Sequence, residues 1–153
     1  MAALEDRREA ILARLLIVAA GVDATFEARR NESSLPDTQK YVILLDGDEH
    51  AIGEPPGRRA DNDPPPQIVE MTPEVQFRLA GKAKDVGAAL NLLRINLIAA
   101  VLKDPTLLSH TVKQRGIRYA GSATATERGR SMEGGIGVAF TLAYLLRPGK
   151  EVA

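Results

Sequence analysis

The run from Ile136 to Leu146 constrains the fold of this chain more than any other stretch of its sequence. Every second position of the run carries a large apolar residue: Ile136, Val138, Phe140, Leu142, Tyr144 and Leu146. This alternation predicts a strand, and the positions between are also small or apolar: Gly137, Ala139, Thr141, Ala143 and Leu145. A helix layer on one face would therefore leave a nearly uncharged second face. Because the run is about twice as long as a usual strand and long uncovered strands tend to aggregate, the sequence predicts a subunit that assembles with others.

Length and composition exclude several other kinds of protein. The 153 residues suit one domain, which at this size buries about 68–70% of the surface that the unfolded chain exposes. The 20 basic and 20 acidic residues balance, so the chain has no overall field to hold a nucleic-acid duplex or an anionic membrane. The absence of cysteine excludes disulfides, thiolate metal sites and cysteine nucleophiles. Charges interrupt the apolar N-terminal stretch and no later segment approaches membrane-spanning length, so we expect a soluble protein.

The first half of the chain alternates between helical and strand periods. Apolar residues recur at helical spacing over residues 3–20, and Gly21 follows as a stop signal. Alternation over residues 22–29 predicts a half-buried strand, and the apolar run Tyr41–Leu45 predicts a second strand that pairs with it. Residues 46–66 then hold clustered prolines, glycines and charges, which predicts a long loop that is either functional or disordered.

The second half predicts one strong helix between strands. Residues 67–79 return to a period of two, and Pro73 places this strand at a sheet edge or at a bulge. Residues 84–103 form the strongest helical pattern, which Asp104-Pro105 ends. Four further apolar residues make the surface of this helix wider than one stripe: Leu92, Ile95, Ala99 and Leu102. The remaining patterns are weaker, with a short turn at 106–111, a strand at 116–120 and a loop at 121–135.

These elements predict an α+β fold in a single domain that spans residues 1–153 and carries a Pro-rich loop insertion at about 46–66. We expect a mixed or mostly antiparallel sheet of four to five strands, with two main helices packed on one face. The wide apolar surface of the second helix indicates that it contacts the sheet with one side and another partner with the other.

Residues that could carry out chemistry are sparse. His50 and His110 fall on separate expected loops with no carboxylate or second histidine at ligand spacing, so both are expected at the surface. The glycines at 134–137 lead into a strand, whereas a dinucleotide-binding fingerprint leads from a strand into a helix. The hydroxyls at 122, 124 and 126 have no nearby base, and the acidic turn at 46–49 lacks the rest of a calcium loop. We therefore expect no enzymatic activity, no metal site and no cofactor.

The order of elements and several local phrases resemble one family. An opening helix is followed by the strand Tyr41–Leu45 and by a strand around Val69–Val75. The helix carrying Asn91-Leu92-Leu93-Arg94 and the closing strand Gly137–Tyr144 complete the pattern, which covers nearly the whole chain outside the Pro-rich segment. In these features the chain resembles the tail terminator, or tail completion, proteins of long-tailed bacteriophages, which are minor tail proteins.

The resemblance implies a structural virion protein with no catalytic residues. Members of the family form hexameric rings on the end of the tail tube, stop its polymerisation and offer a surface for head-tail joining. For this chain it implies a homo-oligomer, expected to be a hexamer, that contacts the tail tube protein and the head-tail connector protein and no membrane. It further implies a place in the tail or neck of the virion, after assembly in the host cytoplasm. DNA would pass transiently and non-specifically through the lumen.

Two groups of residues are the candidates for these contacts. Surfaces with more apolar area than a monomer requires give the subunit-interface candidates: Ala139, Thr141, Ala143, Leu92 and Ile95. Basic residues in the expected loops give the candidates for contact with the tube, the connector or DNA: Arg58, Arg59, Arg128 and Arg130. We expect residues 46–66 and 121–134 to be mobile in the free subunit and ordered by contact with neighbours.

Two other interpretations remain open at the level of sequence. A head-tail adaptor or connector of the phage neck uses similar assembly logic, and it would bind the portal end instead of the tube end. A small ligand-binding or enzymatic α+β domain would require a concave pocket with perturbed ionisable groups, which the sequence does not indicate.

Overall fold

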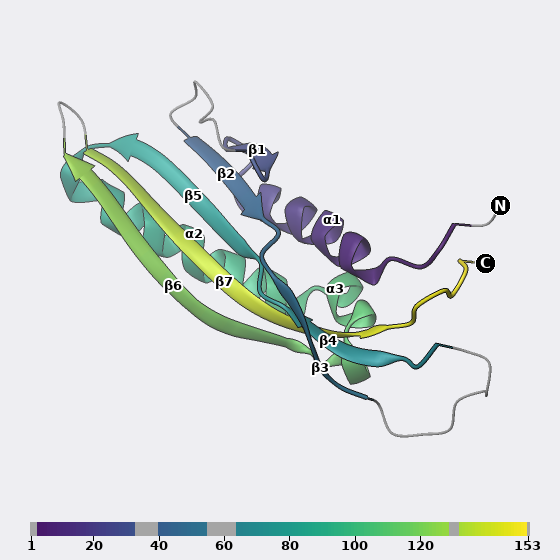
Figure 1. Cartoon of the computed structure of the whole chain (residues 1–153). Helices are drawn as coiled ribbons and strands as arrows, with labels where there is room; N and C mark the ends of the chain where they lie inside the picture. Colours follow the sequence, from purple (N-terminus) through teal and green to yellow (C-terminus); the bar gives the residue numbers. More distant parts are fainter. Residues whose placement is uncertain (1–2, 33–39, 55–63, 129–131, 153) are drawn as a thin grey trace.

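The computed structural model describes residues 3–32, 40–54, 64–128 and 132–152, and every structural statement below concerns these residues (Figure 1). They form three α-helices and a mixed sheet of seven strands, which confirms the α+β class. The elements before the longest helix are α1 (Arg7–Ala20), β1 (Glu27–Arg30), β2 (Lys40–Leu45), β3 (Glu49–Gly53), β4 (Gln67–Met71) and β5 (Glu74–Gly81). The others are α2 (Ala83–Lys103), α3 (Pro105–His110), the 3-10 turn η1 (Val112–Gln114), β6 (Ile117–Arg128) and β7 (Met132–Leu146).

Strand β7 lies at the centre of the sheet and sets its topology. Its first half pairs with β5 and its last residues pair with β4, while β6 follows its other edge. β2 then pairs with β5, and β3 pairs with β4. β1 is parallel to β2, and the remaining pairings within the described strands are antiparallel. The predicted pairing between the second and first strands is confirmed, and the sheet is mixed as expected.

All three helices lie on one face of the long, curved sheet (Figure 1). The buried stripe of α1 packs against β1, β2 and β7, and that of α2 packs against β5, β6 and β7. The close approach of α2 depends on Gly134 in β7. A Cβ atom at Gly134 would lie 2.5 Å from Cγ1 of Val86 and 3.0 Å from Cδ1 of Leu90, so any larger residue would push the helix away. The largest fully buried side chains of this core include Tyr144, Phe77, Phe140, Leu12, Leu97 and Leu142.

On one edge of β7, two short breaks that lie next to each other separate β2 from β3 and β4 from β5. Gly47 lies between β2 and β3, and Thr72 and Pro73 lie between β4 and β5. The backbone N–H of Phe140 in β7 donates to the carbonyl of Pro73 at 3.2 Å, so the ladder continues across the gap. Of the two placements that the sequence allowed for Pro73, the sheet edge is wrong, because β4 and β5 both have a partner strand on each side.

The sequence predicted too few strands because two of them lie in segments expected to be loops. β3 occupies Glu49–Gly53 within the expected loop at 46–66, and β6 continues through residues 121–128 where a second loop was expected. The glycine, alanine and hydroxyl residues of that part of β6 have weak strand preference, but pairing with β7 overrides it. A register shift between Tyr119 and Gly121 leaves Ala120 as a bulge in this pairing. The expected mobile segments are therefore partly strands, and residues 55–63 and 129–131 lie outside the described residues.

Smaller differences occur at the ends of the helices. α1 begins at Arg7, instead of near residue 3, because the side chain of Asp6 caps the helix by accepting from the N–H of Glu9 at 3.0 Å. The residues before it pair with the C-terminal segment through a bridge between Leu4 and Glu151. The expected turn at 106–111 is the short helix α3, and α2 spans the predicted range with one extra residue at its start.

Gly47 provides a first test of this architecture. Its backbone has a φ of +73°, and an added Cβ would lie 2.2 Å from the carbonyl oxygen of Thr72. Gly47→Ala should therefore lower the free energy of unfolding by about 1–3 kcal/mol. Gly87→Ala on the exposed side of α2 meets nothing within 4 Å and should raise it by about 1 kcal/mol through helix propensity. Chemical denaturation of both variants checks this, and a neutral Gly47→Ala would contradict the close approach of Gly47 to Thr72.

A second test concerns the ion pair that joins α1 to the start of α3. Arg14 donates from Nε and Nη2 to the two carboxylate oxygens of Asp104 at 3.0 and 2.8 Å, and Asp104 also accepts from the N–H of Leu107 at 2.9 Å. The hydrogen bonds from Arg14 hold the pKa of Asp104 below its ordinary value of 3.8. A lowered folded-state pKa means that this stabilisation is complete above pH 3.8 and disappears as the pH falls through the folded-state value.

We expect Asp104→Asn to lower the free energy of unfolding at pH 7 while keeping an N-cap residue for α3. The difference between wild type and this variant should shrink below pH 3.8. Asp104→Ala should cost about 1 kcal/mol more than Asp104→Asn, because it also removes the cap. Denaturation curves from pH 7 to pH 2.5 measure both effects, and a difference that does not change with pH would contradict the assignment.

Candidate functional site

The face of β6 and β7 that points away from the helices carries mostly small side chains, with Arg118 of β6 as a charged residue opposite Thr141. We define the outer face by these residues: Gly121, Ala123 and Ala125 of β6, and Gly135, Gly137, Ala139, Thr141 and Ala143 of β7. The strand register places Gly121, Ala123 and Ala125 directly opposite Ala139, Gly137 and Gly135. No helix of the described chain covers this face (Figure 1). The outer face is therefore a strip of small residues that no helix covers, and charged side chains of the neighbouring strands stand beside it: Glu70, Glu74, Arg78 and Arg118.

Two long side chains of β5 border the outer face. Glu74 lies across Gly137, where an added Cβ would be 1.9 Å from its Oε1, and Arg78 lies across Gly135, with its Cγ at 3.1 Å from an added Cβ. These two glycines are buried beneath them, whereas Ala139, Thr141 and Ala143 remain partly exposed.

Helix α2 presents a second surface on the opposite side of the subunit. We define the α2 seam as Ala88, Leu92, Ile95 and Ala99, which follow one another at intervals of four, three and four residues. Leu92 is 61% exposed and Ile95 is 51% exposed, and both alanines are exposed. The same helix buries a separate stripe in the core: Val86, Leu90, Leu93, Leu97 and Val101. A spacing of three and four residues is that of a helix which packs along its length against a partner.

The apolar character of α2 has a further consequence. Its stretch Lys84–Lys103 has a mean hydropathy of 1.6 and is long enough to span a membrane, so the expectation that no segment approaches such a length is wrong. Length and composition alone are weak support for a membrane span, because apolar helices of soluble domains meet the same criterion. Within the subunit Leu92 and Ile95 are the exposed large apolar side chains of this described helix, whereas Ile98 and Leu102 pack against the core.

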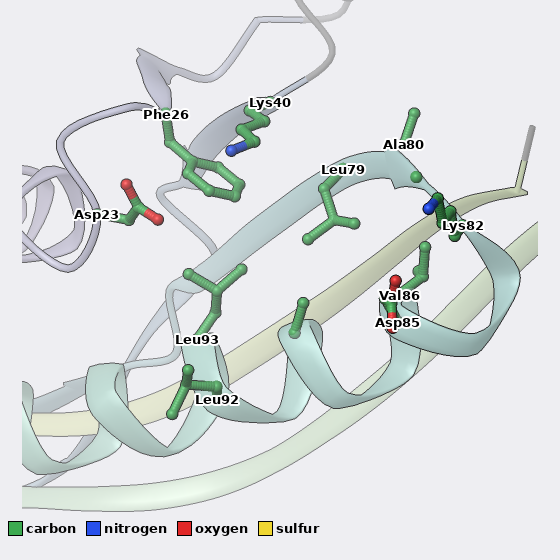
Figure 2. Close-up of a pocket in the computed structure, with 12 residues that line it drawn as sticks. Asp23, Phe26, Lys40, Leu79, Ala80, Lys82, Asp85, Val86, Leu92 and Leu93 are labelled. Carbon is green, nitrogen blue, oxygen red and sulfur yellow. The ribbon is translucent and has the colours of Figure 1, made fainter.

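A cavity of about 440 Å³ lies beside the α2 seam, between α2, the end of β5 and the segment that leads into β1 (Figure 2). Its walls are mainly apolar and include Phe26, Leu79, Val86 and Leu93. Charged residues of both signs also line it: Asp23, Lys40, Lys82 and Asp85. The ammonium group of Lys40 lies 5.8 Å from the centre of the Phe26 ring. Leu92 belongs both to this cavity and to the α2 seam, so the cavity adjoins the seam.

An ionic cluster lies on the same side of the sheet as the outer face. Glu70 of β4 contacts Nη2 of Arg118 at 3.2 Å and Nε2 of His50 at 3.7 Å. The sequence analysis found no carboxylate for His50 because the pairing depends on β3, which it had assigned to a loop. No group of three or more potential metal ligands occurs among the described residues. Since His50 and Arg118 are well exposed, the cluster joins neighbouring strands at the surface.

A second polar cluster ties α1 to β3 and β7. The hydroxyl of Tyr144 donates to the carboxylate of Glu49, which also lies 3.5 Å from Nε of Arg8. Arg8 donates from Nη2 to the carbonyl of Gly47 at 2.7 Å. Burial, together with the Glu49 carboxylate, raises the pKa of Tyr144 above its ordinary value of 10.0. Tyr144 therefore stays a neutral donor, and the cluster fixes the position of α1 on the sheet.

The structure separates the predicted contact residues into distinct surfaces. Ala139, Thr141 and Ala143 lie together on the outer face, and Leu92 and Ile95 lie on the α2 seam at the other side. Residues 58, 59 and 130 lie outside the described residues; Arg128 ends β6, and its side chain also lies outside the described part. The β6 half of the outer face was not predicted from the sequence, although the small residues at 121, 123 and 125 follow the same alternation as those of β7.

Comparison with protein-family models and with curated proteins finds no match for this chain. The outer face and the α2 seam, on opposite sides of one subunit, are therefore the observation from which a function has to be inferred.

Two adjacent leucines test the assignment of the α2 seam. Leu93 is 7% exposed and Leu92 is 61% exposed. Leu93→Ala should lower the free energy of unfolding of the isolated subunit by about 2–5 kcal/mol, because it leaves a cavity in the core. Leu92→Ala should change it by less than about 0.5 kcal/mol. Thermal denaturation at low protein concentration measures both, and equal losses would mean that Leu92 is part of the core.

Proposed function

We propose that this protein is a structural subunit of a bacteriophage virion that forms a ring capping the tail tube. The ring stops polymerisation of the tube and provides the surface that joins the tail to the head connector. The observation that carries the proposal is the presence of two surfaces without a packing layer on opposite sides of one subunit: the small residues of the outer face and the apolar side chains of the α2 seam. A monomer has no use for either, since each leaves apolar area in water.

The form of the assembly follows from the positions of these surfaces. Contacts between unlike surfaces propagate from one subunit to the next, and they close into a ring where the rotation permits it. The resemblance to tail terminator proteins supports a ring of six copies that binds the tail tube protein on one side and the connector protein on the other. The ring would be part of the tail or neck of the virion, after assembly in the host cytoplasm.

We propose no catalytic role for this protein. In the described chain the polar clusters described above join secondary-structure elements to one another. DNA would pass through the lumen with transient, non-specific contacts to basic side chains, a role for which Arg58, Arg59, Arg128 and Arg130 are the candidates. The balanced charge of the chain supports this, because a strongly basic ring would retain the duplex.

Electron microscopy of the purified protein tests the ring. We expect sixfold rings with a lumen wide enough for a duplex. Ala139→Glu and Ala143→Glu should each prevent ring formation, because burying an unpaired carboxylate costs several kcal/mol per contact. Ala13→Glu, on the exposed side of α1, is the matched control and should leave the rings intact. Rings that form equally well from all three variants would exclude the outer face as an interface.

A neck adaptor remains the second candidate, because it would use the same surfaces for assembly. The two functions differ in the partner that the ring binds. A terminator should bind the open end of tail tubes and stop their growth, whereas an adaptor should bind the portal end of the head. Electron microscopy of the rings mixed with growing tail tubes, and separately with DNA-filled heads, identifies which end is occupied.

A further inference from the structure

We infer that Arg94, Tyr119 and Ser122 form a binding site for a phosphate group where α2 packs against β6. The inference goes beyond the proposed function, because it assigns a ligand to residues that lie on neither the outer face nor the α2 seam. Arg94 is a partly buried residue of α2, and its guanidinium reaches across to the hydroxyl groups of Tyr119 and Ser122 on the helix side of β6.

Three polar groups converge at this point. Nε of Arg94 donates to Oγ of Ser122 at 3.3 Å, and Nη2 donates to the hydroxyl oxygen of Tyr119 at 3.4 Å. The two hydroxyl oxygens are 2.5 Å apart, so one hydroxyl donates to the other and the second keeps its hydrogen for another acceptor. Nη1 of Arg94 has no hydrogen-bond acceptor among the described residues. The cluster therefore offers donors of both kinds to a ligand.

The charge of Arg94 is not compensated by a carboxylate within the described chain. Arg14, Arg30 and Arg147 each donate to carboxylate oxygens at 2.7–3.1 Å. Arg94 donates only to neutral hydroxyls, and at longer distances. Hydrogen bonds to charged acceptors are shorter and stronger than those to neutral ones, so an anion at this place would gain what the hydroxyls do not supply.

The cluster is held in position before any ligand binds. The ring of Tyr119 packs edge-on against the buried Phe140, with 6.3 Å between the ring centres. The guanidinium carbon of Arg94 lies 5.5 Å from the centre of the Tyr119 ring. The hydrogen bonds from Ser122 and Arg94 hold the pKa of Tyr119 below its ordinary value of 10.0. A positioned group of this kind loses less conformational freedom on binding than a mobile surface side chain does.

The number of donors favours a phosphate group with three free oxygens. The planar fork of a guanidinium binds two oxygens of a carboxylate or a phosphate. A carboxylate has no further oxygen for the hydroxyl, whereas inorganic phosphate or a phosphate monoester presents a third. Both sources carry the same group, and the phosphodiesters inside a nucleic-acid duplex present only two free oxygens.

A titration with inorganic phosphate at constant ionic strength tests the site, followed by NMR of the arginine Nε–H groups. We expect the Arg94 signal to shift and the signal of the carboxylate-bound Arg14 to stay in place. Arg94→Lys should weaken binding at least about tenfold, because lysine cannot offer the planar fork. Arg115→Lys is the matched control, since Arg115 is exposed and contacts no carboxylate of the described chain, and it should leave the affinity unchanged. Equal affinity of both variants would overturn the inferred site.

The ionisation of Tyr119 gives a second measurement. Tyr41 and Tyr144 are buried, and the chain has no tryptophan, so the first phenolate seen by ultraviolet absorbance should be that of Tyr119. A phosphate dianion beside this hydroxyl should raise the pKa of Tyr119, because it disfavours the phenolate. Tyr119→Phe keeps the ring against Phe140 and should lose both this ionisation and part of the phosphate affinity. A natural chain whose first ionisation does not respond to phosphate would mean that the cluster only joins α2 to β6, which overturns the inference.

Three further ligands distinguish the source of the phosphate group. Thymidine monophosphate should displace inorganic phosphate from the Arg94 site, and thymidine should not. Tighter binding of the nucleotide than of inorganic phosphate supports the site and assigns a monoester as its ligand, whereas equal binding supports it and assigns free phosphate. A blunt duplex without terminal phosphates should leave the Arg94 signal unchanged. Displacement by this duplex at the same phosphate concentration would mean that internal phosphodiesters bind, which overturns the preference for three free oxygens.

Discussion

The pairing of β7 with its neighbours is the constraint on which the rest of the structure depends. One strand holds β5 and β4 on one edge and β6 on the other, so it joins the two halves of the sheet. Its inner side supplies Val138, Phe140 and Leu142 to the core, and Gly134 lets α2 approach that core closely. Its other side carries small residues that no helix covers, and there Gly135 and Gly137 make room for the side chains of Arg78 and Glu74. The same strand therefore fixes the fold and leaves the surface that we propose for assembly.

Helix α2 shows how one element can serve both purposes. Its buried stripe fixes it to the sheet through Leu90, Leu93 and Leu97, and its exposed seam repeats the same spacing toward solvent. Because the two stripes lie on different sides of the helix, we expect a substitution in the buried stripe to act on stability and a substitution in the seam to act on association. Two packing surfaces on one helix would account for an apolar composition that also suits a membrane span.

The sequence was informative wherever a strong period coincided with a packed face. The alternation over 136–146 and the helical pattern over 84–103 were predicted correctly, because each buries a regular stripe of large apolar residues. β3 and the second half of β6 were missed, since exposed or small residues form them and pairing with β4 or β7 decides their structure. The residues of the outer face on β7 were predicted because they belong to the strong alternation over 136–146. The outer-face residues on β6 and the pairing of His50 with Glu70 were not predicted, because they depend on the two strands that were missed.

The bulge at Ala120 reconciles two alternations within β6. Before it the even position Arg118 lies on the outer side of the strand, and after it the odd positions Gly121, Ala123 and Ala125 do. Tyr119 and Gly121 pair with the consecutive residues Phe140 and Ala139, so loss of Ala120 would restore a regular ladder and keep the small residues of β6 on the outer side. The outer face would therefore survive a deletion at position 120, whereas in a strand without a bulge the loss of one residue moves every following side chain to the opposite face.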